Sequence, residues 1–128
     1  MCTGGLSGES KNHIFGKVSI PGDLSRSAGG SSGGEAALIA AKCSVAGIGS
    51  DIAGSLRNPA QACGITALKP SSERFPARGP IPTTGVPGNR ACWGPMARSV
   101  DDLALMMAAM CDEESVQLDI NCIPLKWS

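Results

Sequence analysis

The sequence has few of the residues that bind nucleic acids or metals. Aromatic residues make up 3% of the chain and Tyr is absent, so platforms on which bases could stack are missing. Eleven Lys and Arg balance eleven Asp and Glu, which leaves no basic excess for a phosphate backbone. His13 is the only histidine, and the six cysteines form no C-x-x-C pair. We therefore predict no nucleic-acid partner and no metal site.

Long hydrophobic runs are also missing. The longest, residues 103–110, has eight residues, whereas a membrane-spanning helix needs about 20. The first fifteen residues are polar and glycine-rich and show no signal-peptide pattern. We expect an intracellular protein, cytoplasmic or peripherally membrane-associated, with no transmembrane segment in this chain and with reduced, mostly buried cysteines.

Glycine is concentrated around two serine-containing segments. Residues 29–35 read GGSSGGE, residues 49–57 read GSDIAGSLR, and Ser55 follows Ser31 by 24 positions. Glycine allows positive φ and close approach of the main chain, so two such loops indicate a place where a substrate meets backbone N–H donors. Acyl-transfer chemistry needs this geometry. The first segment alone is more typical of a flexible linker, and the second favours a catalytic loop.

These loops and further segments in the same order resemble the amidase signature family. The further segments are residues 12–16 (NHIFG), 23–26 (DLSR), 63–65 (CGI), 68–70 (LKP) and 94–104 (GPMARSVDDLA). Glu35 and Ile52 favour the branch of the fatty-acid amide hydrolases over the transamidase subunit. The resemblance implies an α/β fold, the amidase signature fold with a mixed twisted sheet between helices. The family's catalytic domain is much longer than this chain, so we expect the fold to be present only in part.

The resemblance also implies a Ser-Ser-Lys triad that hydrolyses carboxylic or fatty-acid amides. Ser55 matches the nucleophile, and Ser31 matches the serine that relays the proton and whose peptide bond is cis in the family. The oxyanion-hole amides correspond to Ile52, Ala53, Gly54 and Ser55, and the supporting positions to Ser32, Asp51 and Arg57. No metal or organic cofactor is implied. The expected partner is a small-molecule or lipid amide substrate, and the full-length form could be a homodimer.

Two features depart from the family pattern. Ala53 stands where the family usually has glycine, and a Cβ there would cost on the order of 1 kcal/mol if the position required φ > 0. The resemblance also implies that the lysine base lies upstream of the first residue, and Lys11 and Lys17 do not carry the lysine motif. The isolated chain is therefore expected to be inactive.

Other interpretations stay open. The chain could belong to a glutamine-hydrolysing transamidase subunit, or be a catalytically inactive remnant or interaction fragment. Asp51 and Arg57 could be a purely structural ion pair. A Ser-His-Asp triad would have to use His13, which is more simply a solvated loop residue.

The chain divides into five stretches of one partial catalytic domain. They are a lead-in loop region (1–28), a serine-loop core (29–70), an irregular crossover (71–94), a signature helix (95–112) and a tail (113–128). The patterns predict a short strand at 17–20, a helix at 35–42, buried strands at 45–48 and 65–68, a helix capped by Asn58 and Pro59 that stops at Gly64, and an amphipathic helix at 99–112. In the last helix, the predicted core face holds Val100, Leu103, Met107 and Met110.

Overall fold

A three-stranded antiparallel sheet lies at the centre of the molecule. The computed structural model describes residues 8–76, 91–111, 114, 117–125 and 127. The strand order is β5 (Ala46–Asp51), β7 (Cys92–Ala97), β6 (Thr66–Ala67), and both outer strands pair antiparallel with β7. Consequently β5 and β6 run in the same direction, joined through α2 (Arg57–Cys63). The predicted α/β class is confirmed; within the described residues every strand pair is antiparallel.

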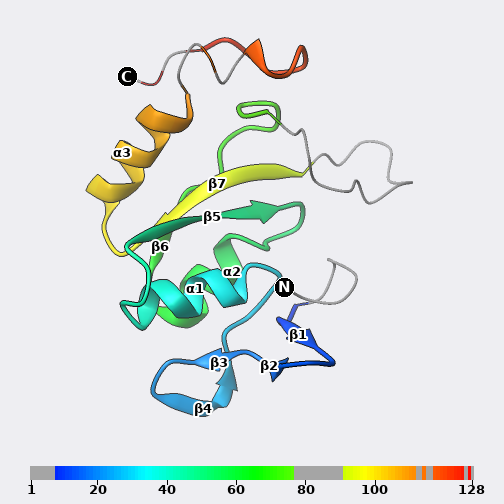
Figure 1. Cartoon of the computed structure of the whole chain (residues 1–128), viewed down its shortest axis with the longest axis vertical. Coiled ribbons are helices and arrows are strands. Elements are labelled where there is room, and N and C mark those ends of the chain that lie inside the picture. The colour runs from blue at the N-terminus through cyan, green and yellow to red at the C-terminus, as the bar shows by residue number, and fades with distance from the viewer. Residues whose placement is uncertain (1–7, 77–90, 112–113, 115–116, 126, 128) are drawn as a thin grey trace.

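Helices cover both faces of this sheet (Figure 1). Helices α1 (Gly33–Ala40) and α2 pack on one face, and α3 (Val100–Met110) packs on the other. The first core cluster joins Met96 of β7 to Ile39 of α1 and Ala60 of α2. The second contains Met107 of α3 and Phe75. The serine loops lie on the side of the first cluster, at the ends of β5 and α1.

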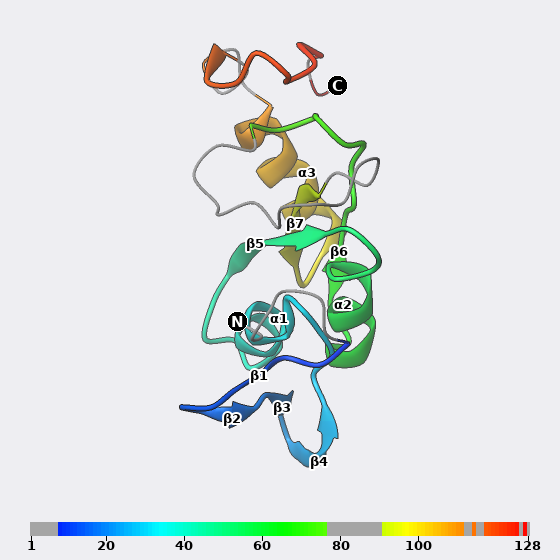
Figure 2. The same cartoon turned by 90° about the vertical axis from the view of Figure 1, so that its right-hand side faces the viewer.

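Two small hairpins form the opposite end of the molecule from α3 (Figure 2). β1 (Lys11–Asn12) pairs with β2 (Gly16–Lys17), and β3 (Ser19–Ile20) pairs with β4 (Asp23–Ser27). The single strand expected at 17–20 is therefore two strands of different hairpins.

The helices match the predicted positions with shifts of one or two residues at their starts and ends. α1 begins at Gly33 instead of Glu35, and α3 begins after Ser99, whose hydroxyl accepts from the Asp102 N–H at 3.1 Å. The N-cap of α2 is Leu56, so the predicted cap at Asn58 is wrong. The predicted stop at Gly64 is confirmed, because this residue adopts the left-handed conformation at φ 67°.

Burial corrects the strand prediction at 45–48. Val45 and Ile48 are 71% and 52% exposed, since β5 is an edge strand of the described sheet and turns Gly47 and Gly49 towards α1. Val100 is also exposed, unlike Leu103 and Met107 of the same predicted face. Strand β7 spans the boundary between the predicted crossover (71–94) and the predicted signature-helix stretch (95–112), so residues 95–97 are strand and not helix. Residues 77–90 of the crossover fall outside the described part.

Candidate active site

The two serine loops meet through direct hydrogen bonds. The Ser32 N–H donates to the Ser55 carbonyl at 3.2 Å. The Ser32 hydroxyl donates to the Ser50 carbonyl at 3.4 Å and accepts from the Ser50 N–H at 3.3 Å. The Gly30–Ser31 peptide bond is cis, as the family resemblance implied. Segments 18 or more positions apart in the sequence thus lie in direct contact.

Glycine in β5 makes this approach feasible. A Cβ on Gly49 would lie 2.8 Å from the Ser32 hydroxyl, 2.7 Å from Cδ2 of Leu56 and 2.9 Å from the Met96 sulfur. Each distance is far below ordinary van der Waals contact, so a side chain at this position would displace three closely packed neighbours. Gly49 therefore lets the start of α1 pack directly against the strand that leads to Asp51.

Asp51 holds the second serine loop from inside. Its carboxylate is 1% exposed and accepts four hydrogen bonds. Oδ1 accepts from the Gly54 N–H at 2.7 Å and Arg57 Nη2 at 3.1 Å. Oδ2 accepts from the Leu56 N–H at 3.1 Å and Arg57 Nε at 3.0 Å. The loop between β5 and α2 is thereby folded around one carboxylate.

This environment keeps Asp51 ionised. Burial alone would raise the pKa of the carboxyl group, but the hydrogen bonds from Arg57, Gly54 and Leu56 outweigh it and lower the pKa from 3.8 to about 2. The Arg57 side chain is 57% exposed, so its charge stays largely hydrated. The structure therefore shows the Asp51–Arg57 ion pair that the sequence analysis offered as a structural alternative. This pair also fixes the backbone around Ser55.

The loop conformation corrects the expectation about Ala53. The left-handed residue of this loop is Gly54, at φ 117°, while Ala53 is absent from the described non-glycine residues with positive φ. Its Cβ consequently adds no left-handed strain. The Gly54 N–H is engaged with Asp51, whereas the amides of Ile52, Ala53 and Ser55 donate to no other described residue.

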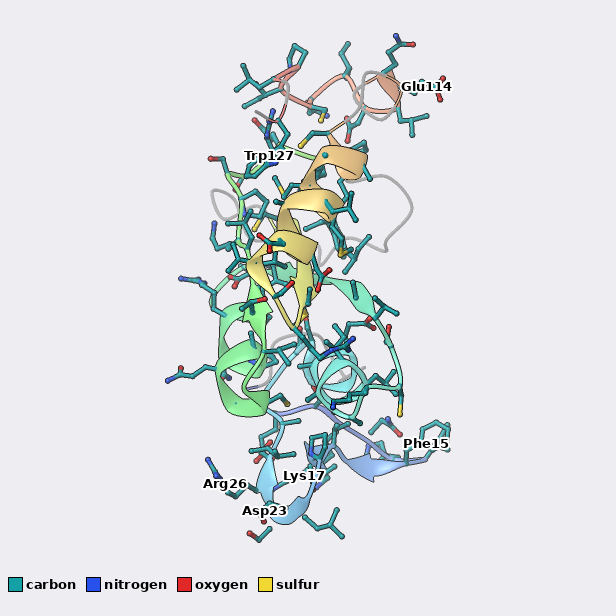
Figure 3. The ribbon with its side chains drawn as sticks, turned by 90° about the vertical axis from the view of Figure 1, so that its left-hand side faces the viewer. Phe15, Lys17, Asp23, Arg26, Glu114 and Trp127 are labelled. Atoms are coloured by element: carbon teal, nitrogen blue, oxygen red, sulfur yellow. The ribbon has the colours of Figure 1, made fainter. Side chains whose placement is uncertain are left out.

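The serine hydroxyls, like these amides, differ in whether they already make a hydrogen bond. Among the residues that the structure describes, the Ser32 hydroxyl is bonded to backbone and those of Ser31 and Ser55 have no hydrogen bond. Of the other candidate groups, His13 is exposed in the turn between β1 and β2. The Lys17 ammonium pairs with Glu9 at 3.6 Å, and its side chain lies at the hairpin end of the molecule (Figure 3).

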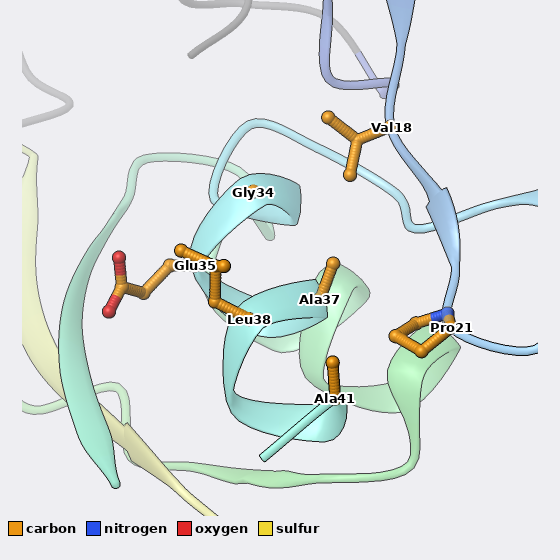
Figure 4. A pocket seen from close by; sticks show the side chains of 7 residues that line it. All are labelled: Val18, Pro21, Gly34, Glu35, Ala37, Leu38 and Ala41. Atoms are coloured by element: carbon orange, nitrogen blue, oxygen red, sulfur yellow. The ribbon is translucent and has the colours of Figure 1, made fainter. Parts of the chain in front are cut away.

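A separate surface pocket lies beside α1. Val18 and Pro21 face Gly34, Glu35, Ala37, Leu38 and Ala41 across it (Figure 4). None of the predicted site residues lines this pocket. In the described part of the chain, no cluster of His, Cys, Asp and Glu could hold a metal ion, and no helix is long and apolar enough to cross a membrane.

Ser10 is a site neighbour that the sequence patterns did not predict. Its hydroxyl contacts both the Ser31 carbonyl and the Gly33 N–H, although 21 positions separate it from Ser31. A serine in a glycine-rich lead-in carries no periodic or capping signal, so only the folded structure shows the contact.

Comparison with known proteins identifies the family. The Amidase family profile matches residues 1–127, and the chain belongs to this family. It is 48% identical to human fatty-acid amide hydrolase 2 over 103 residues, covering 80% of this chain and 19% of that protein. It is 42% identical to a glutamyl-tRNA(Gln) amidotransferase subunit of Methylobacillus flagellatus over 105 residues, covering 82% and 21%.

A solved structure shows the same fold. A fatty acid amide hydrolase matches with a TM-score of 0.91 and 37% identity, over 97% of this chain and 22% of that one. The chain spans 25% or less of the length of the curated relatives it matches.

Proposed function

We propose that the protein hydrolyses carboxylic or fatty-acid amides through an acyl-serine intermediate on Ser55. The observation that carries the proposal is the hydrogen bond from the Ser32 N–H to the Ser55 carbonyl, which joins the two serine loops. Family membership and the similarity to fatty-acid amide hydrolase 2 support amide substrates, including lipid amides. A homodimeric full-length form is part of the same proposal and rests on the resemblance alone.

The proposed reaction begins with attack of the Ser55 oxygen on the amide carbon. Its proton passes to Ser31 while Ser31 gives its own to a neutral lysine outside residues 1–128. The oxyanion receives hydrogen bonds from backbone N–H groups among Ile52, Ala53 and Ser55. The C–N bond then breaks, and the leaving amine takes the proton that returns through Ser31. Water hydrolyses the acyl-serine by the reverse relay.

The supporting residues hold this arrangement in place. Asp51 and Arg57 fix the loop that carries Ser55, because the carboxylate binds two amides of that loop and the guanidinium together. Ser32 ties the start of α1 to β5 through Ser50. Together these residues hold the backbone N–H donors for the oxyanion in place before the reaction starts. Such preorganised donors are usually the largest single contribution to lowering the barrier of acyl transfer.

Glutamine hydrolysis within a transamidase is the second candidate. The similarity to an amidotransferase subunit favours it, whereas Glu35 and Ile52 favour the amide hydrolase branch. In the complete gene product, we expect faster hydrolysis of long-chain acyl amides than of glutamine. Release of ammonia from glutamine alone would favour the transamidase.

The test is kinetic. Ser55→Ala and Ser31→Ala should each lower kcat for an acyl amide by a factor of about 10³ or more, because members of a triad act as a unit. Ser72→Ala, an exposed serine outside both loops, is the control and should leave kcat unchanged. Amide turnover that survives Ser55→Ala would contradict the proposal, as would the absence of amide turnover in the unmodified protein.

A further inference from the structure

Ser10 is fully buried and lies against the loop that carries Ser31. Its hydroxyl donates to the Ser31 carbonyl at 3.1 Å and accepts from the Gly33 N–H at 2.9 Å. Its backbone N–H donates to the Gly29 carbonyl at 3.0 Å, and its carbonyl accepts from the Val18 N–H at 2.9 Å. Ser10 is thus fixed on both sides and contacts the serine loop at three points.

The Ser31–Ser32 peptide unit is held at both of its edges. Its carbonyl accepts from the Ser10 hydroxyl, and its N–H donates to the Ser55 carbonyl at 3.2 Å. In a trans peptide these two groups point in opposite directions, so the two bonds restrain rotation of the plane. The orientation of this plane sets the direction of the Ser31 side chain relative to the Ser55 loop.

Ser10 also satisfies one of the backbone N–H groups that have no partner inside the helix at the start of α1. Ser32 is the N-cap of α1 and makes no side-chain capping bond; its hydroxyl is bonded to Ser50 instead. The N–H of Gly33, at the first position of the helix, is satisfied by Ser10 from 23 positions away. Ser10 thus holds the first N–H of α1, while the Ser32 hydroxyl joins the start of the helix to β5.

We propose that Ser10 is a positioning residue that orients Ser31 for proton transfer to the leaving amine. The inference rests on the proposed function, in which Ser31 is the relay. A tilted Ser31 would slow the step in which the C–N bond breaks and the amine takes a proton. A p-nitrophenyl ester of the same acyl group loses a leaving group that needs no proton, so it depends less on this orientation.

The experiment compares these two substrates in the complete gene product. Ser10→Ala should lower kcat for the acyl amide about tenfold and kcat for the ester by less than about threefold, with KM unchanged for both. Ser10→Thr keeps the hydroxyl and should restore the ratio of amide to ester turnover. Ser19→Ala is the matched control, because the Ser19 hydroxyl also donates to a carbonyl, that of Leu24 in the hairpin.

A second variant covers a failure of Ser10→Ala to fold. A Cβ on Gly33 would lie 2.5 Å from the Ser10 hydroxyl, so Gly33→Ala should displace it and produce the same selective loss. Equal losses for amide and ester, or no loss in either variant, would overturn the role of Ser10. Amide turnover that survives Ser55→Ala would instead overturn the proposed function, so the two failures are distinguishable.

Discussion

Replacing Asp51 by Asn tests how strongly one carboxylate holds the Ser55 loop. Each oxygen of Asp51 accepts from one backbone N–H and one nitrogen of Arg57. An Asn side chain has only one acceptor oxygen, and its NH₂ group would face two donors whichever way it turned. Asp51→Asn should therefore destabilise the fold as well as the loop.

The magnitude follows from the pKa of the carboxyl group. Its fall from 3.8 to about 2 on folding corresponds to about 2 kcal/mol of stability at neutral pH. A carboxyl group whose pKa is lowered on folding stabilises the fold at pH values above its unfolded pKa. This stability is lost as the pH falls through its folded pKa. The difference in free energy of unfolding between wild type and Asp51→Asn should thus stay constant above pH 3.8 and become smaller between pH 3.8 and about 2.

Urea unfolding of the complete gene product at several pH values measures this difference. Asp23→Asn is the control, because Asp23 is only partly buried and, among the described residues, its carboxylate accepts from Ser25 alone; its unfolding midpoint should move far less. Equal stability of Asp51→Asn and wild type at neutral pH would refute the reasoning. So would a difference that grows on acidification.

Three further predictions follow from the loops, the sheet and the family resemblance. Ala53→Gly should leave amide kcat unchanged, because Ala53 has no left-handed strain to relieve; a large loss would mean that the methyl group has a role of its own. Gly94→Ala should destabilise the fold by about 3 kcal/mol or more in thermal unfolding, since its Cβ would overlap the Leu68 carbonyl oxygen, and a stability like that of wild type would contradict this packing. Residues 1–128 alone should show no more than residual amide hydrolysis, because the proposed lysine base lies outside them. They should also aggregate in light scattering, because several large apolar side chains are exposed, among them Ile14 (83%), Phe15 (84%) and Leu105 (72%). Robust turnover by a monodisperse sample would contradict both expectations.

The sequence predicted the helices because their signals are local. The apolar periodicity and Ser99 cap of α3, and the left-handed Gly64 after α2, depend on residues within a few positions. The start of α2 was missed because its N-cap, Leu56, makes no side-chain capping bond.

Strand β7 could not be predicted because Gly94 and Pro95 are typical strand breakers. In the fold, Gly94 allows the Leu68 carbonyl to approach, and Pro95, which has no N–H, still accepts from the Leu68 N–H at 3.1 Å. Both residues therefore fit the central strand through contacts with a segment that is remote in sequence.

The candidate site was predictable at the serine loops and not at their supports. Ser31, Ser55 and the Asp51–Arg57 pair lie in recognisable motifs, and their roles in catalysis stay predictions. The contacts of Ser10 depend on how the lead-in segment folds back, which no spacing in the sequence reveals.

The central claim is that Ser55 is the acyl-accepting nucleophile, and covalent labelling tests it most directly. The complete gene product is treated with a fluorophosphonate, digested, and the modified residue located by tandem mass spectrometry. We predict a single labelled site at Ser55, with labelling lost in Ser55→Ala and retained in the Ser72→Ala control. A label located on Ser31, or labelling that persists in Ser55→Ala, would contradict the account.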